Sequence, residues 1–267
     1  ARLMTRLRAV RPGILHAHMF HANLLARCVR LVCPVPVVIS TIHSLAESPR
    51  NSDKVHRRDL LYRGTNVLSD MTVCVSGAIA ARYAAIRAVS KDHLRVIPNG
   101  VDTDRFRSDP ASRARIRESL CLGDEFAWLA VGRLMWKKDF VTMLEAMARQ
   151  SGSVLLIAGE GPLDEKLRAQ SVELGARVRF LGLREDVEHL MNACDGLVLS
   201  SVVEGLPMVL VEAAACALPC VATDVAGVRE VVLDGETGFV VPVRDPVALA
   251  AAMTRLAAMP IEARTRL

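Results

Sequence analysis

Glu204-Gly-Leu-Pro-Met-Val-Leu-Val-Glu212 sets two glutamates eight residues apart, directly after a short apolar strand pattern at 197–200. Glu204 lies beside a Gly-x-Pro break, and Glu212 lies in a helical pattern that otherwise holds valine, leucine and alanine. A carboxylate in so apolar a helix is costly to bury unless a partner donates hydrogen bonds to it, and a ribose diol offers two such donors. The free N–H groups at the helix start suit a phosphate. The stretch therefore predicts a segment that holds both ends of a nucleotide diphosphate; the alternative is a Glu212 paired with a nearby arginine.

Outward from this stretch, apolar strand patterns alternate with helical patterns along the chain. The predicted strands lie at 14–17, 35–41, 71–75, 94–97, 127–132, 153–158, 178–181, 197–200, 220–223 and 238–241. The predicted helices lie at 2–10, 22–31, 54–69, 78–88, 112–120, 140–150, 163–174, 186–193, 209–216 and 246–256. Continuous apolar strands between helices indicate parallel sheets covered on both faces and linked by right-handed crossovers. The predicted fold class is α/β, with doubly wound, Rossmann-like halves.

The two halves meet near Pro98-Asn99-Gly100-Val101-Asp102, where Pro-Asn-Gly is a strong turn signal. Gly100 is expected to supply a positive φ there. We therefore expect one domain over 1–104 and a second over 105–267. The first half lacks the opening strand and glycine-rich turn of a doubly wound unit. Because helical patterns also run to both ends of the sequence, we interpret the chain as a fragment.

The composition narrows the classes of protein that the chain can represent. Of its 267 residues, 51% are apolar, enough for a substantial core, and only 4% are aromatic, which argues against a stacking platform for single-stranded nucleic acid. The net charge is +5, and a basic face can serve an anionic ligand, a membrane surface or nucleic acid, or can simply be solvated. Much of the excess is early, at Arg2, Arg6, Arg8, Arg11, Arg27, Arg30, Lys54, Arg57 and Arg58.

Seven scattered cysteines form no Cys-x-x-Cys motif and mostly lie among apolar residues. They are typical of small core side chains in a reducing compartment, which favours a cytoplasmic protein. The histidines and cysteines lack the spacing of a zinc site, so no metal is expected. No apolar run reaches the 18 or so residues of a membrane span, and no signal peptide is visible.

Candidate ligand-binding residues follow the predicted strands of the second half. Gly132-Arg133 and Lys138 come after the strand at 127–132, where ligands bind in open α/β sheets. A guanidinium and an ammonium together neutralise a diphosphate and stabilise it as a leaving group. Two surface cations near a loop are the alternative.

Two further turns carry weaker signals. Gly159-Glu160-Gly161-Pro162 gives a tight turn before a helix, but it is not the Gly-x-Gly-x-x-Gly fingerprint of dinucleotide-binding proteins. At 182–186 the backbone near Leu183 is a candidate to read a base edge, and Asp186 is expected to cap the following helix.

In the first half, His43 ends an apolar strand where it should open onto a cleft. An imidazole donates a hydrogen bond to a sugar hydroxyl or a phosphoryl oxygen, although a lone histidine is more often structural. His18 and His21 are weaker candidates.

Taken in order, these motifs resemble the retaining, metal-independent glycosyltransferases of the GT-B fold, known as family 4 or "group 1". The resemblance runs from about Ile14 to the end of the sequence. The residues that carry it are Thr41-Ile-His43, Val75-Ser76, Pro98–Asp102, Gly132-Arg133 with Lys138, Gly159–Pro162, and Glu204 with Glu212.

The resemblance implies two Rossmann-like domains facing across a cleft, with 1–104 on the acceptor side and 105–267 binding the nucleotide sugar. It implies transfer of a sugar, with retention, from a UDP- or GDP-sugar to a glycan or lipid-linked acceptor. No cofactor, metal or nucleic acid is implied. Peripheral contact with the inner membrane face is compatible with the basic first half.

The same resemblance assigns roles to residues. Arg133 and Lys138 should hold the diphosphate, Glu212 the ribose hydroxyls, and Glu204 the hydroxyls of the transferred sugar. His43 should face that sugar across the cleft, and the departing phosphate should take the proton of the acceptor. The remaining donor contacts are expected from Gly132, Gly161, Leu183, Gly205 and Leu206.

Two departures from the family pattern stand out. Asp139 occupies a position where glycine commonly follows the lysine, and Leu206-Pro207 replaces Phe-Gly, which removes one backbone donor. Because the glycine-rich loop that opens the family's first domain is absent, the alternatives are a nucleotide-sugar-binding fragment without catalysis or a sugar-nucleotide epimerase on the same fold.

Overall fold

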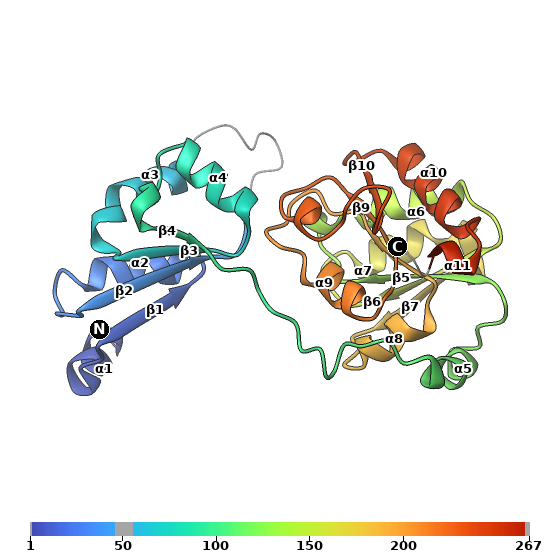
Figure 1. The fold of residues 1–267 in the computed structure, drawn as a ribbon, viewed down its shortest axis with the longest axis horizontal. Helices are drawn as coiled ribbons and strands as arrows, with labels where there is room; N and C mark the ends of the chain where they lie inside the picture. The colour runs from blue at the N-terminus through green and yellow to red at the C-terminus, as the bar shows by residue number, and fades with distance from the viewer. Residues whose placement is uncertain (1, 46–55, 265–267) are drawn as a thin grey trace. The chain divides into compact units, whose positions relative to one another are not determined.

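The computed structural model describes residues 2–45 and 56–264, so the first residues of the helix predicted at 54–69 lie outside the described chain (Figure 1). The chain divides into two compact units, Ala1–Asn99 and Gly100–Leu267.

The first unit is built on a four-stranded parallel sheet in the order β1-β2-β3-β4. Its elements are α1 (Arg2–Val10), β1 (Ile14–His18), α2 (Phe20–Val29), β2 (Val37–Ile42), α3 (Arg57–Thr65), η1 (Asn66–Leu68), β3 (Met71–Cys74), α4 (Gly77–Ala85), η2 (Lys91–His93) and β4 (Leu94–Val96).

Because the strands of this sheet follow one another in chain order, right-handed crossovers place α2, α3 and α4 on the same face. Contacts between the helices agree with this placement. The amide of Asn23 on α2 donates to the hydroxyl of Tyr62 on α3, and Arg82 on α4 forms an ion pair of 2.8 Å with the buried Asp59 on α3. Leu7 of α1 packs into the same cluster as α2.

The second unit is built on a six-stranded parallel sheet in the order β10-β9-β8-β5-β6-β7. Its helices are α5 (Pro110–Ser119), α6 (Phe140–Ala148), α7 (Asp164–Gln170), α8 (Val187–Ala193), α9 (Met208–Ala215), α10 (Pro246–Ala257) and α11 (Ile261–Arg264), with the 3₁₀ turns η3 (Trp136–Lys138), η4 (Val172–Arg177) and η5 (Val228–Glu230). Its strands are β5 (Phe126–Val131), β6 (Ser153–Ala158), β7 (Val178–Gly182), β8 (Gly196–Leu199), β9 (Cys220–Thr223) and β10 (Gly238–Val241).

This strand order is that of a doubly wound sheet. The chain runs outward from β5 through β6 to β7, returns to the other side of β5 at β8, and continues to β10. Helices cover both faces, and alternate residues of β5 point into the two cores: Leu129 packs with α8 and α9, whereas Trp128 packs with α6 and α10. The direction reverses between β5 and β8, and ligands of open α/β sheets bind at the carboxyl ends of such a strand pair.

The predicted strands and helices of both units form, with small differences at their ends. The helix predicted at 140–150 ends at Ala148, and the one predicted at 163–174 divides into α7 and η4 at Ser171. The prediction for Gly100 was wrong: Gly100 has no positive φ, because the segment around it forms no turn and needs no left-handed residue. No helix among the described residues is both long and apolar enough to cross a bilayer.

Candidate functional site

The loop that leaves β5 carries the two predicted cations. Gly132 has a φ of 156°, and a Cβ at this position would lie 3.3 Å from Cε of Lys138, so the glycine leaves room for the lysine side chain. Arg133 is exposed and has no hydrogen bond or ion pair with any described residue. Asp139 ends the loop in the left-handed region, with φ 46° and ψ 47°. Aspartate tolerates this conformation better than most residues, and Thr142 donates a hydrogen bond of 2.7 Å to its carboxylate. The loop therefore ends in a left-handed conformation that a glycine would also adopt readily.

Lys138 and Glu204 meet across the point where the sheet reverses direction. The ammonium of Lys138 donates to Oε1 of Glu204 at 2.7 Å, and the two side chains are 22% and 13% exposed. Ser201, two residues after β8, donates to the same oxygen at 2.6 Å. Ser200 donates to the carbonyl of Lys138 at 2.8 Å, so the loops after β5 and β8 are bonded through backbone as well as side chains. The ammonium keeps two N–H donors, and Oε2 of Glu204 accepts no hydrogen bond within the described chain.

Glycines hold the neighbouring loops against the loop after β5. Gly159 has a φ of 143°, and a Cβ there would overlap the carbonyl of Gly132. A Cβ on Gly161 would likewise overlap the backbone of Leu134. Gly161 therefore has a clear packing role. Leu183 is exposed after β7, and its N–H lies 3.4 Å from the carboxylate of Glu160.

Gly205 and Leu206 are buried and lead directly into α9. A Cβ on Gly227 would overlap the carbonyl of Gly205, so the turn before η5 holds this segment in place. Pro207 occupies the N-cap of α9 and provides no side-chain cap. None of the described residues accepts a hydrogen bond from the N–H groups of Met208 or Val209. The start of α9 therefore has the open donors that an anion requires.

Glu212 lies one turn into α9 and is partly buried. Burial raises the pKa of its carboxyl group, and the charge of Arg105 opposes the rise. The predicted alternative, a direct pair with an arginine, does not form in the described chain. Arg105 instead forms an ion pair of 2.8 Å with Glu188. Glu212 thus has a partly desolvated carboxylate that accepts no hydrogen bond from residues 2–45 or 56–264.

His43 belongs to the first unit, where three histidines from β1 and the end of β2 lie together. Nδ1 of His18 lies 3.0 Å from Nε2 of His43, and the rings of His16 and His18 are 4.3 Å apart. Burial lowers the pKa of His43, and the nearby His18 and His16 lower it further. His43 is therefore held neutral to lower pH than an isolated histidine.

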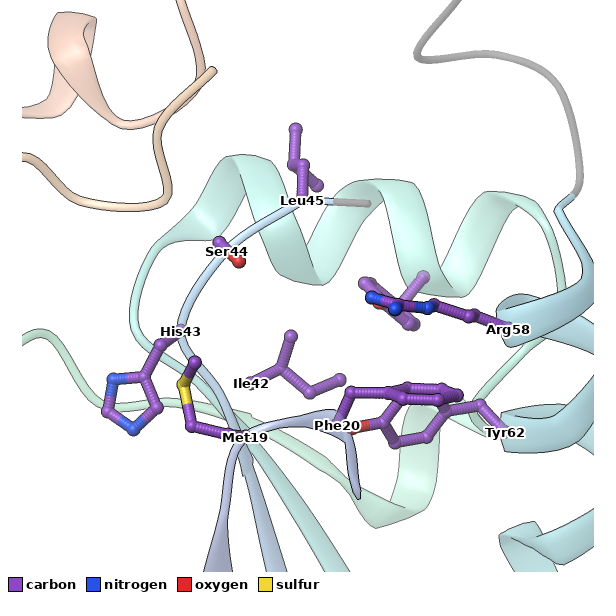
Figure 2. Close-up of a pocket in the computed structure, with 9 residues that line it drawn as sticks. Met19, Phe20, Ile42, His43, Ser44, Leu45, Arg58 and Tyr62 are labelled. Carbon is purple, nitrogen blue, oxygen red and sulfur yellow. The ribbon is translucent and has the colours of Figure 1, made fainter. Parts of the chain in front are cut away.

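His43 also borders a pocket of about 50 Å³ in this unit (Figure 2). Figure 2 shows Arg58, Phe20 and Tyr62 grouped on one side of the pocket, with His43 and Met19 on the other. The guanidinium carbon of Arg58 lies 4.7 Å from the ring centroid of Phe20. Met19 has φ 73° and ψ 156°, a conformation that is costly for any residue but glycine and is often found at functional sites. The pocket therefore combines backbone strain, aromatic surface and a cation.

One further prediction was wrong and two residues were missed. Asp186 occupies the N-cap of α8 but does not cap it, because its carboxylate pairs with Arg184 at 2.6 Å. Ser201 and Arg105 were not predicted. Ser201 lies just past an apolar strand and three residues before a glutamate, which is a usable signal. Nothing in the sequence links Arg105 to residues more than 80 positions away. No group of potential metal ligands forms among residues 2–45 and 56–264.

Comparison with protein families gives two matches that together cover most of the chain. Residues 125–259 match the family described as "Glycosyl transferases group 1", and residues 1–105 match "Glycosyltransferase Family 4".

Among curated proteins, the chain is 28% identical over 257 residues to the UDP-Gal:alpha-D-GlcNAc-diphosphoundecaprenol alpha-1,3-galactosyltransferase of Escherichia coli, covering 90% of the chain and 65% of that protein. It is 35% identical over 209 residues to the GDP-mannose-dependent alpha-(1-6)-phosphatidylinositol monomannoside mannosyltransferase of Mycolicibacterium smegmatis, covering 72% and 54%. The chain thus spans between about half and two thirds of the length of these relatives.

Among solved structures, Anabaena Alr3699/HepE in complex with UDP-glucose matches with a TM-score of 0.86 at 22% identity, covering 99% of the chain and 73% of that protein. The sucrose-phosphate synthase of Thermosynechococcus elongatus matches with the same TM-score at 26% identity, covering 98% and 69%. These likenesses show the GT-B fold.

Proposed function

Because the chain belongs to the group 1, or family 4, glycosyltransferases, we propose that it binds a nucleoside diphosphate sugar and serves its transfer, with retention, to an acceptor. The observation that carries the proposal is the Lys138–Glu204 pair, at the point where the sheet of the second unit reverses direction. This pair lies next in the chain to a helix start with open N–H groups, as a site for an elongated anionic donor requires.

In the proposed complex the diphosphate lies between the loop after β5 and the start of α9. Arg133 is exposed and without a partner among the described residues, so its guanidinium is available to a phosphate at little desolvation cost. Lys138 contributes its two remaining N–H donors while Glu204 fixes its direction. The N–H groups at the start of α9 complete the anion site.

The rest of the donor extends from this centre in two directions. Glu212 accepts from the ribose hydroxyls, which supply the donors that its partly buried carboxylate lacks. The free Oε2 of Glu204 accepts from a hydroxyl of the transferred sugar, beside the backbone of Gly205 and Leu206. The loop around Leu183 borders the base.

Catalysis in this scheme is stabilisation of the leaving group. Negative charge grows on the β-phosphate as the glycosidic bond breaks, and the fixed cations and N–H dipoles stabilise that charge without reorganisation. Following the family resemblance, the departing phosphate accepts the proton of the acceptor hydroxyl. The family resemblance assigns His43 to the transferred sugar, and the lowered pKa of His43 keeps its imidazole neutral.

The names of the relatives guide the choice of substrates. One uses UDP-Gal and another GDP-mannose, and their acceptors are a diphosphoundecaprenol-linked sugar and a phosphatidylinositol monomannoside. We therefore propose a UDP- or GDP-hexose donor and a glycan or lipid-linked acceptor. All seven cysteines are free, as is usual in a reducing compartment. This agrees with our proposal that the protein acts in the cytoplasm, at the inner membrane face.

The test is a pair of measurements on the same sample. Thermal shift with UDP, GDP and their sugar derivatives detects binding, because a ligand of the native state raises its stability. Mass spectrometry after incubation with the nucleotide sugar that binds, and with a lipid-linked sugar acceptor, then detects the product. Binding without a product identifies a nucleotide-binding module, conversion of the donor sugar to its epimer identifies an epimerase, and no binding of any nucleotide contradicts the proposal.

A further inference from the structure

The charge of the chain is divided unequally between its two units. Residues 1–99 hold fifteen lysines and arginines against five acidic residues, a net charge of +10, whereas residues 100–267 have a net charge of −5. A diphosphate site in the second unit does not account for a positive charge concentrated in the first.

Helix α3 presents much of this charge together with exposed apolar side chains. Asp59 and Tyr62 are buried, and Leu60 and Leu61 on the opposite side of the helix are 54% and 50% exposed. Arg57 and Arg63 are exposed beside them and have no hydrogen bond or ion pair with another described residue. Beyond the helix end, Val67 is 84% exposed. The outer face of α3 therefore combines exposed leucines with arginines that have no partner in the described part of the chain.

The helices α1 and α2 also expose basic or apolar side chains. Leu25 of α2 is 55% exposed, on the side of the helix away from the buried Asn23 and Arg27. Helix α1 exposes Arg2, Arg6 and Arg8 to solvent. The only carboxylate on α1, α2 and α3 is Asp59, which is buried and bonded to Arg82. The outer surface of these helices is thus basic and apolar, without a negative side chain.

Charge complementarity decides which partner fits this surface. A second copy that paired through this same face would bring like charges together. A nucleic acid would neutralise the arginines but leave the leucines in water. An anionic bilayer satisfies both groups, because arginines bind lipid phosphates while apolar side chains enter the boundary with the acyl chains.

We infer that the outer face of α2 and α3, formed by Leu25, Arg57, Leu60, Leu61, Arg63 and Val67, docks the chain onto an anionic lipid surface. This inference rests on the proposed function, to which it gives a means of reaching a lipid-linked acceptor. Docking requires neither nucleotide nor acceptor, so it is measured independently of transfer.

The experiment is co-sedimentation of the 267-residue chain with vesicles of phosphatidylcholine alone and of phosphatidylcholine mixed equally with phosphatidylglycerol. We expect binding to the mixed vesicles, weakened by salt, and little binding to the neutral ones. Arg57→Glu with Arg63→Glu should lower the partition coefficient by at least about fivefold for each arginine. Leu60→Ser with Leu61→Ser should also lower it, and should leave residual binding that high salt removes.

Matched controls come from exposed residues of the second unit. Arg115→Glu with Arg244→Glu, and Val172→Ser with Val247→Ser, change the same numbers of charges and apolar groups and should leave vesicle binding unchanged. Thermal unfolding of every variant checks that it is folded, and titration with UDP checks the nucleotide site.

The inference is overturned if the chain does not co-sediment with the mixed vesicles or if it binds neutral vesicles equally well. It is also overturned if the control variants lose as much binding as the α3 variants. Retention of RNA without vesicle binding would assign the charge to nucleic acid and reject the inference. Vesicle binding without UDP binding would instead contradict the proposed function alone.

Discussion

Lys138 and Glu204 are 66 residues apart in the sequence, yet their side chains lie 2.7 Å apart at the carboxyl ends of β5 and β8. The bond uses one of the three N–H donors of the ammonium and one oxygen of the carboxylate. The pair therefore orients the ammonium of Lys138 and leaves its other two N–H donors available to a ligand.

The first prediction concerns the two cations. Arg133→Ala or Lys138→Ala should weaken binding of UDP or GDP by about 10- to 150-fold, because a hydrogen bond to a charged group contributes about 1.5–3 kcal/mol. Isothermal calorimetry measures the loss. Lys137→Ala is the matched control in the same loop and should bind nucleotide normally. Unchanged affinity in both cation variants would exclude them from the site.

The second prediction concerns Glu204 and distinguishes binding of the nucleotide from turnover of the nucleotide sugar. Glu204→Gln keeps an oxygen that accepts from Lys138 but removes a negative charge near the diphosphate. UDP binding should strengthen a few-fold, on the order of 1 kcal/mol, while turnover of the nucleotide sugar falls. Calorimetry and product mass measure the two effects. Weaker UDP binding in this variant would show that the charge of Glu204 is needed to place Lys138.

The third prediction uses the raised pKa of Glu212, which burial causes. The folded state holds the proton of this group more tightly than the unfolded state, so the charged form destabilises the fold at neutral pH. Glu212→Gln should therefore raise Tm at neutral pH, and the gain should vanish as the pH falls through 4.5, the ordinary pKa of the group.

The same substitution should weaken binding of UDP and of uridine alike, because both carry the ribose. Higher stability combined with lower affinity is the signature of a carboxylate kept for a ligand. Loss of stability at neutral pH would refute the account.

The fourth prediction concerns the left-handed residue that ends the loop after β5. Asp139→Gly loses the hydrogen bond with Thr142 but suits the backbone, whereas Asp139→Ala also pays for the left-handed conformation, about 1–2 kcal/mol. Urea unfolding should rank Asp139→Ala as the less stable variant by about that amount. Equal stability of the two would mean that the conformation is not retained.

The fifth prediction concerns the histidines of the first unit. Burial is the main reason for the lowered pKa of His43, and His18 adds to it. His18→Gln should raise the pKa of His43 but leave it below the ordinary value. NMR titration of the ring protons measures this. No change would show that the two rings do not interact in solution.

Much of the fold was predictable because strand and helix signals are local. The strands at 153–158 and 220–223 form over the predicted residues, and α10 begins at Pro246, where the helix predicted at 246–256 begins. Glu212 was singled out because a carboxylate is unusual in an apolar helix, and its partial burial, which raises its pKa, agrees with that part of the reasoning.

The contacts between distant residues were not predictable in this way. The bond between Lys138 and Glu204 depends on β8 pairing with β5, and no single segment of the sequence determines the order of the strands. Asp186 shows that even an interaction between residues close in the sequence can be mispredicted. The position of Asp186 at a helix start predicts a side-chain cap. Its carboxylate instead forms an ion pair with Arg184, two residues away.

The close approaches of Gly159 to Gly132, of Gly161 to Leu134, and of Gly227 to Gly205 restrict how the protein can be re-engineered. Any side chain at these three glycines would push apart the loops that carry the candidate site, so a library aimed at new donor specificity should leave them fixed. Leu183 is on a neighbouring loop but is exposed, and its side chain is free of such a constraint. Substitutions at Leu183 would vary the proposed contact with the base and leave the packing of these loops unchanged.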